Sequence, residues 1–288
     1  MINKKALAQF VKTVILVLCF GFIFNKLSEV ELDFSAFFFP TFLPIFLIVL
    51  LLMPVNWCLE ALRWQISLPE EKIPFRESLK IVLRGLAMNW MLPFATGDLT
   101  SRITESRGKK ISMVALGYNR LTILFITVVY GAFSIAFFTE SNDALYYLAP
   151  LLSVLLLVLI LIISRNSFLG LPTQFLNSFI AWRVVLLTLL RYCIFTLQFY
   201  LLISFFNPDL SSFIVTMGIG WVFMFRSFIP SLFGNLGVRE ASSILFFQPY
   251  IEDLSLIMLP CLLIWLINTV IPSLVGVIPI ITFRPKLS

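Results

Sequence analysis

The sequence predicts an all-α integral membrane protein, and its composition and its apolar runs support this fold class. Hydrophobic residues make up 60% of the 288 residues, only 12% are charged, and the mean hydropathy is +1.00. A soluble domain carries about 45–50% apolar and about 25% charged residues, so this composition leaves too little polar surface for water. Several apolar runs also reach the roughly 20 residues that a helix needs to cross a bilayer. We therefore expect one membrane domain over residues 1–288.

Six apolar runs are long enough for complete spans. They cover approximately residues 6–24, 38–59, 113–138, 144–164, 183–206 and 254–281. The first run follows basic residues, as the apolar part of a signal peptide does. It lacks a small-residue cleavage site, so we expect an uncleaved first helix.

The charges of the loops predict the orientation, because cytoplasmic loops are enriched in lysine and arginine. Both termini and one set of loops are basic. Their lysines and arginines include Lys4, Lys5, Arg63, Lys72, Arg76, Lys80, Arg102, Arg107, Lys109, Lys110, Arg284 and Lys286. The loops on the other side are acidic, with Glu29, Glu31, Asp33, Glu140, Asp143, Asp209, Glu252 and Asp253. We expect the basic loops and the N- and C-termini to be cytoplasmic.

Two further segments, residues 79–101 and 211–248, are interrupted by proline, glycine and polar residues. Loops of the same charge flank each segment on both sides, so each should leave the membrane on the side where it enters. Broken backbone at membrane depth is tolerated only where protein or a wet cavity covers it. We predict two re-entrant helical hairpins; an ordinary span kinked at proline is the alternative for each.

The two hairpins share a motif with identical spacing. The first reads Pro93-x-x-x-Gly97-Asp98-Leu99-x-x-Arg102, and the second Pro230-x-x-x-Gly234-Asn235-Leu236-x-x-Arg239. The halves 1–143 and 144–288 each contain two spans, a hairpin and a span, in opposite orientations. Inverted repeats are typical of transporters, whose substrate sites lie where interrupted helices meet. The sequence thus predicts an inverted repeat, with a chance match of the two motifs as the alternative.

Each residue type in the motif has a local role at the tip of the hairpin. Proline ends the inbound helix, glycine permits the reversal, and Asp98 or Asn235 is expected as the N-cap of the outbound helix. The expected tip residues are Pro93, Gly97, Pro230, Gly234 and Gly237. A helix N-terminus followed by Arg102 or Arg239 favours an anion such as a lipid phosphate.

Arginines also lie within the apolar runs, where a charge costs roughly 2.5–3.5 kcal/mol at the bilayer centre. The main acids expected to pair with them are Asp98 and Glu240. The excess of positive charge indicates an anionic ligand, so the candidate headgroup-binding residues are Arg102, Arg239, Arg120, Arg84, Arg226, Asp98, Asn235 and Glu240. The alternative is that each arginine reaches an interface or pairs with an acid, as Arg239 could with Glu240.

Metal, cofactor and nucleotide chemistry have little support. The chain has no histidine, and its four cysteines (Cys19, Cys58, Cys193 and Cys261) show no metal-ligand spacing. No G-x-x-x-x-G-K-[ST] motif occurs, so ATP hydrolysis of the usual kind is not expected. We expect no catalytic residues, no metal, no cofactor and no nucleic-acid partner.

Several of these motifs resemble those of a known family. They are Arg63-Trp64, the Pro93–Arg102 hairpin, Asn119-Arg120 and Gly237-Val238-Arg239-Glu240. Over most of the chain the sequence resembles the transmembrane, flippase-like domain of lysylphosphatidylglycerol synthases and their stand-alone relatives. The resemblance implies a domain that moves or handles phospholipids or polyprenyl-linked lipids between leaflets of a bacterial-type plasma membrane.

Two departures from the family pattern leave the lipid open. Family members often carry glutamate where Asp98 stands, and the second half has Trp265 and Asn268 where an arginine would match Arg120. Full-length synthases add a soluble domain that joins lysine to the lipid. This chain ends at Ser288, just past the last span, so aminoacyl transfer is not expected.

We therefore expect a lipid flippase or transporter that binds anionic phospholipid or polyprenyl-linked headgroups at the two hairpins. One alternative is a non-transporting membrane partner of a lipid-modifying enzyme. Another is a transferase acting on a lipid carrier. Such enzymes usually need carboxylates to hold a metal or act as bases, whereas the membrane-adjacent acids here are few and scattered and no D-x-D or D-D pair occurs. Membrane lipids are the expected partners, and a partner enzyme and a homo-oligomer are left open.

Overall fold

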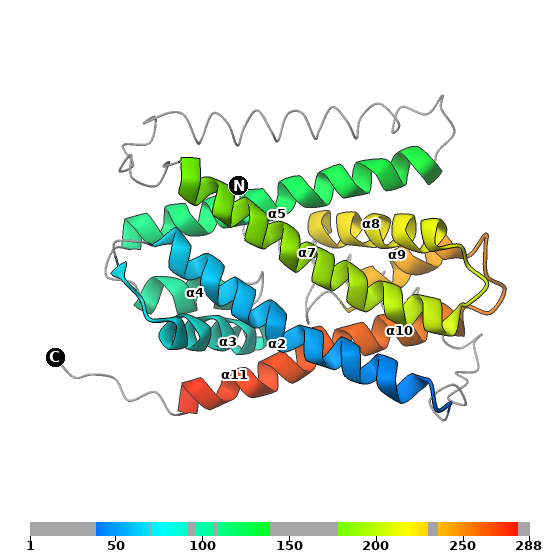
Figure 1. Cartoon of the computed structure of the whole chain (residues 1–288), viewed down its shortest axis with the longest axis horizontal. Helices are drawn as coiled ribbons and strands as arrows, with labels where there is room; N and C mark the ends of the chain where they lie inside the picture. The colour runs from blue at the N-terminus through cyan, green and yellow to red at the C-terminus, as the bar shows by residue number, and fades with distance from the viewer. Residues whose placement is uncertain are drawn as a thin grey trace, which may run out of the picture. The chain divides into compact units, whose positions relative to one another are not determined.

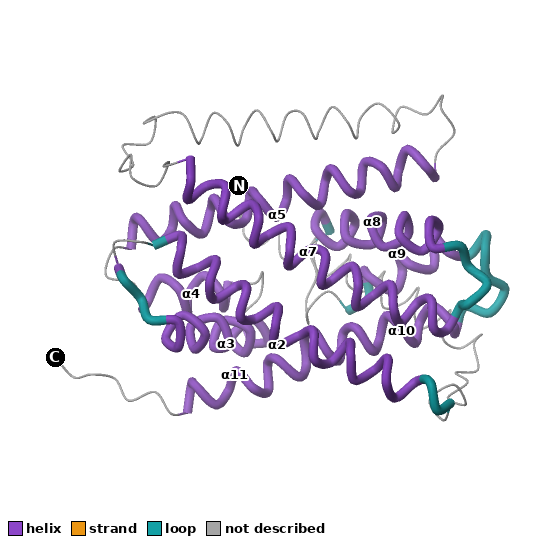
Figure 2. The backbone as a smooth tube through the Cα atoms, in the orientation of Figure 1, coloured by secondary structure: helices purple, strands orange, loops and turns teal. Residues whose placement is uncertain are grey.

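The computed structural model describes residues 39–68, 71–91, 96–105, 109–138, 178–229 and 236–281, and all regular elements in these ranges are helical (Figures 1 and 2). The helices are α2 (Phe42–Ser67), α3 (Phe75–Met91), α4 (Thr96–Glu105), α5 (Lys109–Phe138), α7 (Ser178–Phe206), α8 (Ser212–Phe228), α9 (Val238–Phe247), α10 (Ser255–Trp265), the π-helical η7 (Leu266–Val270) and α11 (Ile271–Ile281). The all-α prediction is confirmed for this part of the chain.

Four stretches of helix are long and apolar enough to cross a membrane. They are Phe42–Ser67, Ile111–Ala136, Trp182–Phe206 and Ser255–Ile278, with mean hydropathies of 2.4, 1.5, 1.8 and 2.2. They coincide with four of the six expected spans; the other two, at 6–24 and 144–164, lie outside the described residues. Large apolar side chains such as Leu51 and Leu274 are two-thirds exposed, as expected for helices that face lipid.

Both interrupted segments form a pair of short helices. The first pair is α3 and α4, of 17 and 10 residues, and the second is α8 and α9, also of 17 and 10 residues. At 1.5 Å per residue, a 10-residue helix rises only about 15 Å, half of the roughly 30 Å hydrocarbon core. Neither pair can therefore be two complete spans. The tip residues Pro93, Pro230, Gly234 and Asn235 lie outside the described residues, and re-entry stays a prediction.

The chain divides into two compact units. Unit 1 comprises residues 1–49, 127–149 and 196–265, and unit 2 comprises 50–126, 150–195 and 266–288. The borders fall within α2, α5 and α7 and between α10 and η7. Each unit thus contains one helix pair, together with one end of each long helix.

In unit 2, glycines allow close packing of α3 against α4 and α11. A Cβ atom on Gly97 of α4 would overlap the backbone of Met88 and Asn89, and one on Gly276 of α11 would overlap the carbonyl of Leu83. Gly97 was expected to permit the chain reversal by its backbone freedom, but it lies within α4 without a positive φ. Its small size, rather than an unusual backbone conformation, is what this position requires.

Unit 1 is built around the α8–α9 pair, and aromatic side chains fill much of its interior. A Cβ atom on Gly218 of α8 would overlap the ring of Phe247 on α9. Phe42 packs against Phe205 with ring centroids 5.5 Å apart, in a cluster completed by buried Phe206 and Leu259. The packing in this unit is therefore mainly apolar.

The glycine at the α3–α4 interface can be tested with a matched pair of substitutions. We expect Gly97→Ala to destabilise the protein by about 1–3 kcal/mol, because backbone atoms occupy the place of the new methyl group. Gly117→Ala on α5 is the control, since nothing lies within 4 Å of its Cβ position. Thermal denaturation of the detergent-purified proteins measures both, and equal midpoints would contradict the packing assigned to Gly97.

Candidate functional site

A polar stripe runs along the last turns of α2. Its residues are Asn56, Glu60, Arg63 and Ser67, whose spacings of four, three and four residues place them on one face of the helix. All four are buried, with 3%, 5%, 3% and 0% exposure. Buried polar and charged groups are tolerated only when they are paired, so this face of α2 requires polar partners from other helices.

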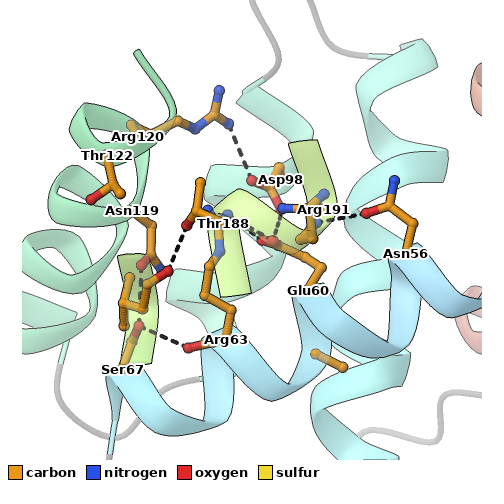
Figure 3. A network of polar contacts seen from close by, with 12 residues as sticks. Asn56, Glu60, Arg63, Ser67, Asp98, Asn119, Arg120, Thr122, Thr188 and Arg191 are labelled. Atoms are coloured by element: carbon orange, nitrogen blue, oxygen red, sulfur yellow. Dashed lines mark hydrogen bonds and ion pairs between the residues drawn. The ribbon is translucent and has the colours of Figure 1, made fainter. Parts of the chain in front are cut away.

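Glu60 is the centre of those partnerships (Figure 3). Its carboxylate lies 2.6 Å from Nη2 of Arg63 and 2.5 Å from Nη2 of Arg102, and it also pairs with Nη1 of Arg191. These arginines come from α2, α4 and α7 respectively. One carboxylate therefore ties three helices of unit 2 together.

The arginines around Glu60 are held by further hydrogen bonds. Arg191 donates through Nε to Oδ1 of Asn56 at 2.7 Å, and Arg63 donates through Nη1 to the Thr188 hydroxyl at 3.1 Å. The Ser67 hydroxyl donates to the carbonyl oxygen of Arg63 at 2.8 Å. The bonds to Asn56 and Thr188 fix the direction in which the guanidinium groups of Arg191 and Arg63 point.

Asp98 on α4 links this centre to α5. Its Oδ1 accepts a hydrogen bond from Nε of Arg102 at 2.6 Å, and its Oδ2 lies 3.1 Å from Nη2 of Arg120. Asp98 was expected as the N-cap of the outbound helix, and this was wrong. Helix α4 already begins at Thr96, so Asp98 lies inside its first turn, where its carboxylate binds two arginines.

These six charged side chains form what we call the arginine cluster: Glu60, Arg63, Asp98, Arg102, Arg120 and Arg191. Four guanidinium groups face two carboxylates, which gives a formal charge of +2. Arg102 lies between the carboxylates of Asp98 and Glu60, and its guanidinium carbon is 4.8 Å from the centre of the Trp64 ring.

The cluster retains hydrogen-bond donors that no group in the described part of the chain accepts. Nη1 of Arg102 and Nε of Arg63 have no hydrogen-bond partner there, and both side chains are buried, with 3% exposure. Arg120 differs, because its side chain is 49% exposed and its ion pair is with Asp98. An arginine that is half exposed, next to buried and unused donors, is an arrangement suited to an anion.

The corresponding arginine in unit 1 has a different environment. Arg239 is 1% exposed, and its Nε lies 3.4 Å from Oε1 of Glu240. Oε2 of Glu240 accepts a hydrogen bond from the backbone N–H of Gly237 at 2.6 Å. Gly237 is the N-cap of α9 with a φ of 96°, a conformation that favours glycine. Here the protein's own carboxylate occupies the helix N-terminus, and Asn235 precedes the cap by two residues.

The structure brings together only some of the candidate residues. Arg102, Arg120 and Asp98 meet in the arginine cluster, and Arg239 meets Glu240. Arg84 is partly buried on α3 and is not among the arginines of the cluster, whereas Arg226 of α8 lies over the ring of Phe223 at 5.5 Å. Within the described ranges, no group of three histidine, cysteine or acidic side chains could hold a metal.

Three members of the cluster, Glu60, Arg63 and Arg191, were absent from the sequence-based site. Arg63 was assigned to a cytoplasmic loop, and Glu60 was not counted among the acids at membrane depth, because the expected span ended at residue 59. Helix α2 continues to Ser67, which puts both side chains inside the protein. The available signal was the helical spacing of Asn56, Glu60, Arg63 and Ser67.

The central carboxylate can be tested by removing its charge. We expect Glu60→Gln to destabilise the protein by about 3–5 kcal/mol, since three arginines lose a buried counter-charge. Glu77→Gln on α3 is the matched control, because Glu77 is half exposed and pairs with exposed Lys80. Its loss should cost at most about 1 kcal/mol. Similar thermal midpoints for the two purified variants would contradict the role assigned to Glu60.

Comparison with known proteins agrees with the resemblance seen in the motifs. No curated protein and no solved structure matches the chain. A family model does match it over residues 9–276, and this family is described as the lysylphosphatidylglycerol synthase TM region. The match includes both helix pairs and all six members of the arginine cluster. The chain therefore belongs to the family of the lysylphosphatidylglycerol synthase TM region.

Proposed function

We propose that this protein binds the phosphate headgroups of membrane lipids at the arginine cluster and moves these lipids between the leaflets of a bacterial-type plasma membrane. Family membership supports a lipid-related role in the membrane. The observation that carries the proposal is the positive charge left over in the cluster, where four arginines face two carboxylates.

Guanidinium groups suit a phosphate ligand because their planar N–H donors match its oxygens. Arg120 is accessible for a first contact, and Nη1 of Arg102 is a buried donor free for a second. A headgroup loses water when it enters the membrane, and bonds to these donors would replace part of its hydration. The barrier to crossing would fall while the acyl chains stay in the bilayer.

Arg239 in unit 1 is the second candidate contact. Its buried Nη2 has no hydrogen-bond partner among the described residues, although Glu240 already offsets the charge of the side chain. In the proposed cycle the arginine cluster and Arg239 each receive the headgroup at a different stage. No nucleotide motif occurs in the sequence, so transport would follow the lipid gradient or be coupled to an ion.

The proposal is tested by lipid exchange in liposomes that contain the purified protein. We expect the wild-type protein to speed the movement of a fluorescent anionic phospholipid between leaflets. Arg102→Ala with Arg239→Ala should slow it by about 10- to 100-fold, the loss expected for charge-assisted hydrogen bonds of 1.5–3 kcal/mol. The loss of Arg102 also removes its ion pairs with Glu60 and Asp98 and so affects the fold. Arg120→Gln is therefore a second variant, because the Arg120 side chain is half exposed and its loss disturbs the protein interior less.

The matched control is Arg76→Gln, which removes an exposed arginine of α3 that lies outside the cluster. Its exchange rate should equal that of the wild-type protein. Unchanged exchange in the double variant and in Arg120→Gln would contradict the proposal. Lipid binding without any exchange by the wild-type protein would instead favour the non-transporting partner of a lipid-modifying enzyme.

A further inference from the structure

We infer that the arginine cluster selects a phosphate group that carries two negative charges, as in a phosphomonoester or a diphosphate, over a phosphodiester that carries one. The inference rests on the proposed function, since it specifies the ligand of the same site. It concerns the charge of the bound group, which can be measured separately from transport.

The first argument is the charge balance of the cluster. Glu60 offsets one of the arginines that surround it, and Asp98 offsets another, so two positive charges lack a counter-charge within the cluster. Uncompensated charge is expensive at the buried guanidinium groups of Arg63 and Arg102, whereas solvent screens part of the charge of half-exposed Arg120. A phosphodiester would leave one charge uncompensated, whereas a dianionic phosphate would bring the cluster to neutrality.

The second argument is the number of unused donors. Nη1 of Arg102 and Nε of Arg63 are buried without acceptors in the part of the chain that the structure describes, and Arg120 is half exposed beside Asp98. A phosphomonoester presents three terminal oxygens as strong acceptors, one more than a phosphodiester. Three arginines with free or accessible donors therefore suit the larger number of acceptor oxygens.

Unit 1 provides an internal comparison. There Arg239 pairs with Glu240, the one ion pair that it forms within the described ranges, so the pair has a formal charge of zero, and Glu240 also accepts the N–H of Gly237. A dianion at this position would introduce two negative charges next to a carboxylate. The preference for a dianion is thus expected of the arginine cluster and not of the Arg239–Glu240 pair.

The experiment measures lipid binding to the full chain in phosphatidylcholine nanodiscs by native mass spectrometry. Phosphatidic acid serves as the dianionic lipid and phosphatidylglycerol as the monoanionic one. A phosphomonoester has a second pKa near 6, so its binding should rise by about tenfold or more between pH 5 and pH 8. Binding of phosphatidylglycerol should stay constant over this range, because its phosphodiester does not titrate there.

The protein itself should contribute little to this pH dependence. The charged groups of the cluster are Glu60 and Arg63 of α2, Asp98 and Arg102 of α4, Arg120 of α5 and Arg191 of α7, and helix α3, which packs against α4, adds Arg84. The chain has no histidine, the side chain whose ordinary pKa lies between pH 5 and pH 8, and phosphatidylglycerol reports any change of the protein itself over this range. A rise in binding that is restricted to phosphatidic acid therefore reports on the ligand.

Substitutions change the cluster charge by single steps. Arg120→Gln lowers it to +1 and should reduce the preference for phosphatidic acid at pH 8 by about tenfold, whereas Arg120→Lys should retain most of it. Arg76→Gln alters an exposed arginine outside the cluster and should leave the preference unchanged. Equal affinity of the wild-type protein for the two lipids at pH 8 would overturn the inference, as would the same preference in Arg120→Gln.

Inorganic phosphate distinguishes a lipid headgroup from free phosphate as the source of the dianion. If millimolar phosphate displaces phosphatidic acid at pH 8, the dianion preference stands and free phosphate is the ligand. If it does not, the preference stands with a lipid as the ligand. If the protein exchanges both lipids in liposomes and binds both with equal affinity, the dianion preference is refuted and the proposed transport stands. If the protein binds phosphatidic acid selectively but exchanges neither lipid, the proposed transport is refuted and the dianion preference stands.

Discussion

The carboxylate of Glu60 is the interaction on which unit 2 depends. It accepts ion pairs from α2, α4 and α7, three helices that are far apart in the sequence. A guanidinium group transferred from water to a protein interior without a counter-charge costs several kcal/mol. Arg63, Arg102 and Arg191 can all be buried because they converge on one acid. Glu60 thus determines where the end of α2 and the α3–α4 pair can lie within this unit.

Asp98 extends the same principle towards the exposed edge of the cluster. It binds buried Arg102 through one oxygen and half-exposed Arg120 through the other, so α4 and α5 are joined through a single side chain. Gly85 of α3 makes room for it, because a Cβ atom there would lie 3.0 Å from Asp98 Oδ1. Helix packing and charge placement are therefore coupled. The position of Asp98 depends on a glycine, and the position of Arg120 depends on Asp98.

The long apolar helices could be predicted from the sequence, because span length follows from hydropathy and bilayer thickness. The expected spans at 38–59, 113–138, 183–206 and 254–281 all correspond to helices of the structure. The end of α2 could not be predicted from hydropathy, since Glu60 and Arg63 look like the start of a polar loop until their partners on α4 and α7 are known. For the same reason, local capping rules failed at Asp98, where pairing with arginines outweighs the N-cap preference.

The composition of the two units bears on the predicted inverted repeat. Unit 2 contains the end of α2, the start of α5, the start of α7 and α11, together with α3 and α4. Unit 1 contains the start of α2, the end of α5, the end of α7 and α10, together with α8 and α9. An inverted repeat that exchanges α2 with α7 and α5 with α10–α11 would give this partition. Such a repeat would build both units on one backbone plan. The side chains would then distinguish them, since the arginine cluster of unit 2 keeps two uncompensated positive charges, whereas Arg239 of unit 1 is paired with the adjacent Glu240.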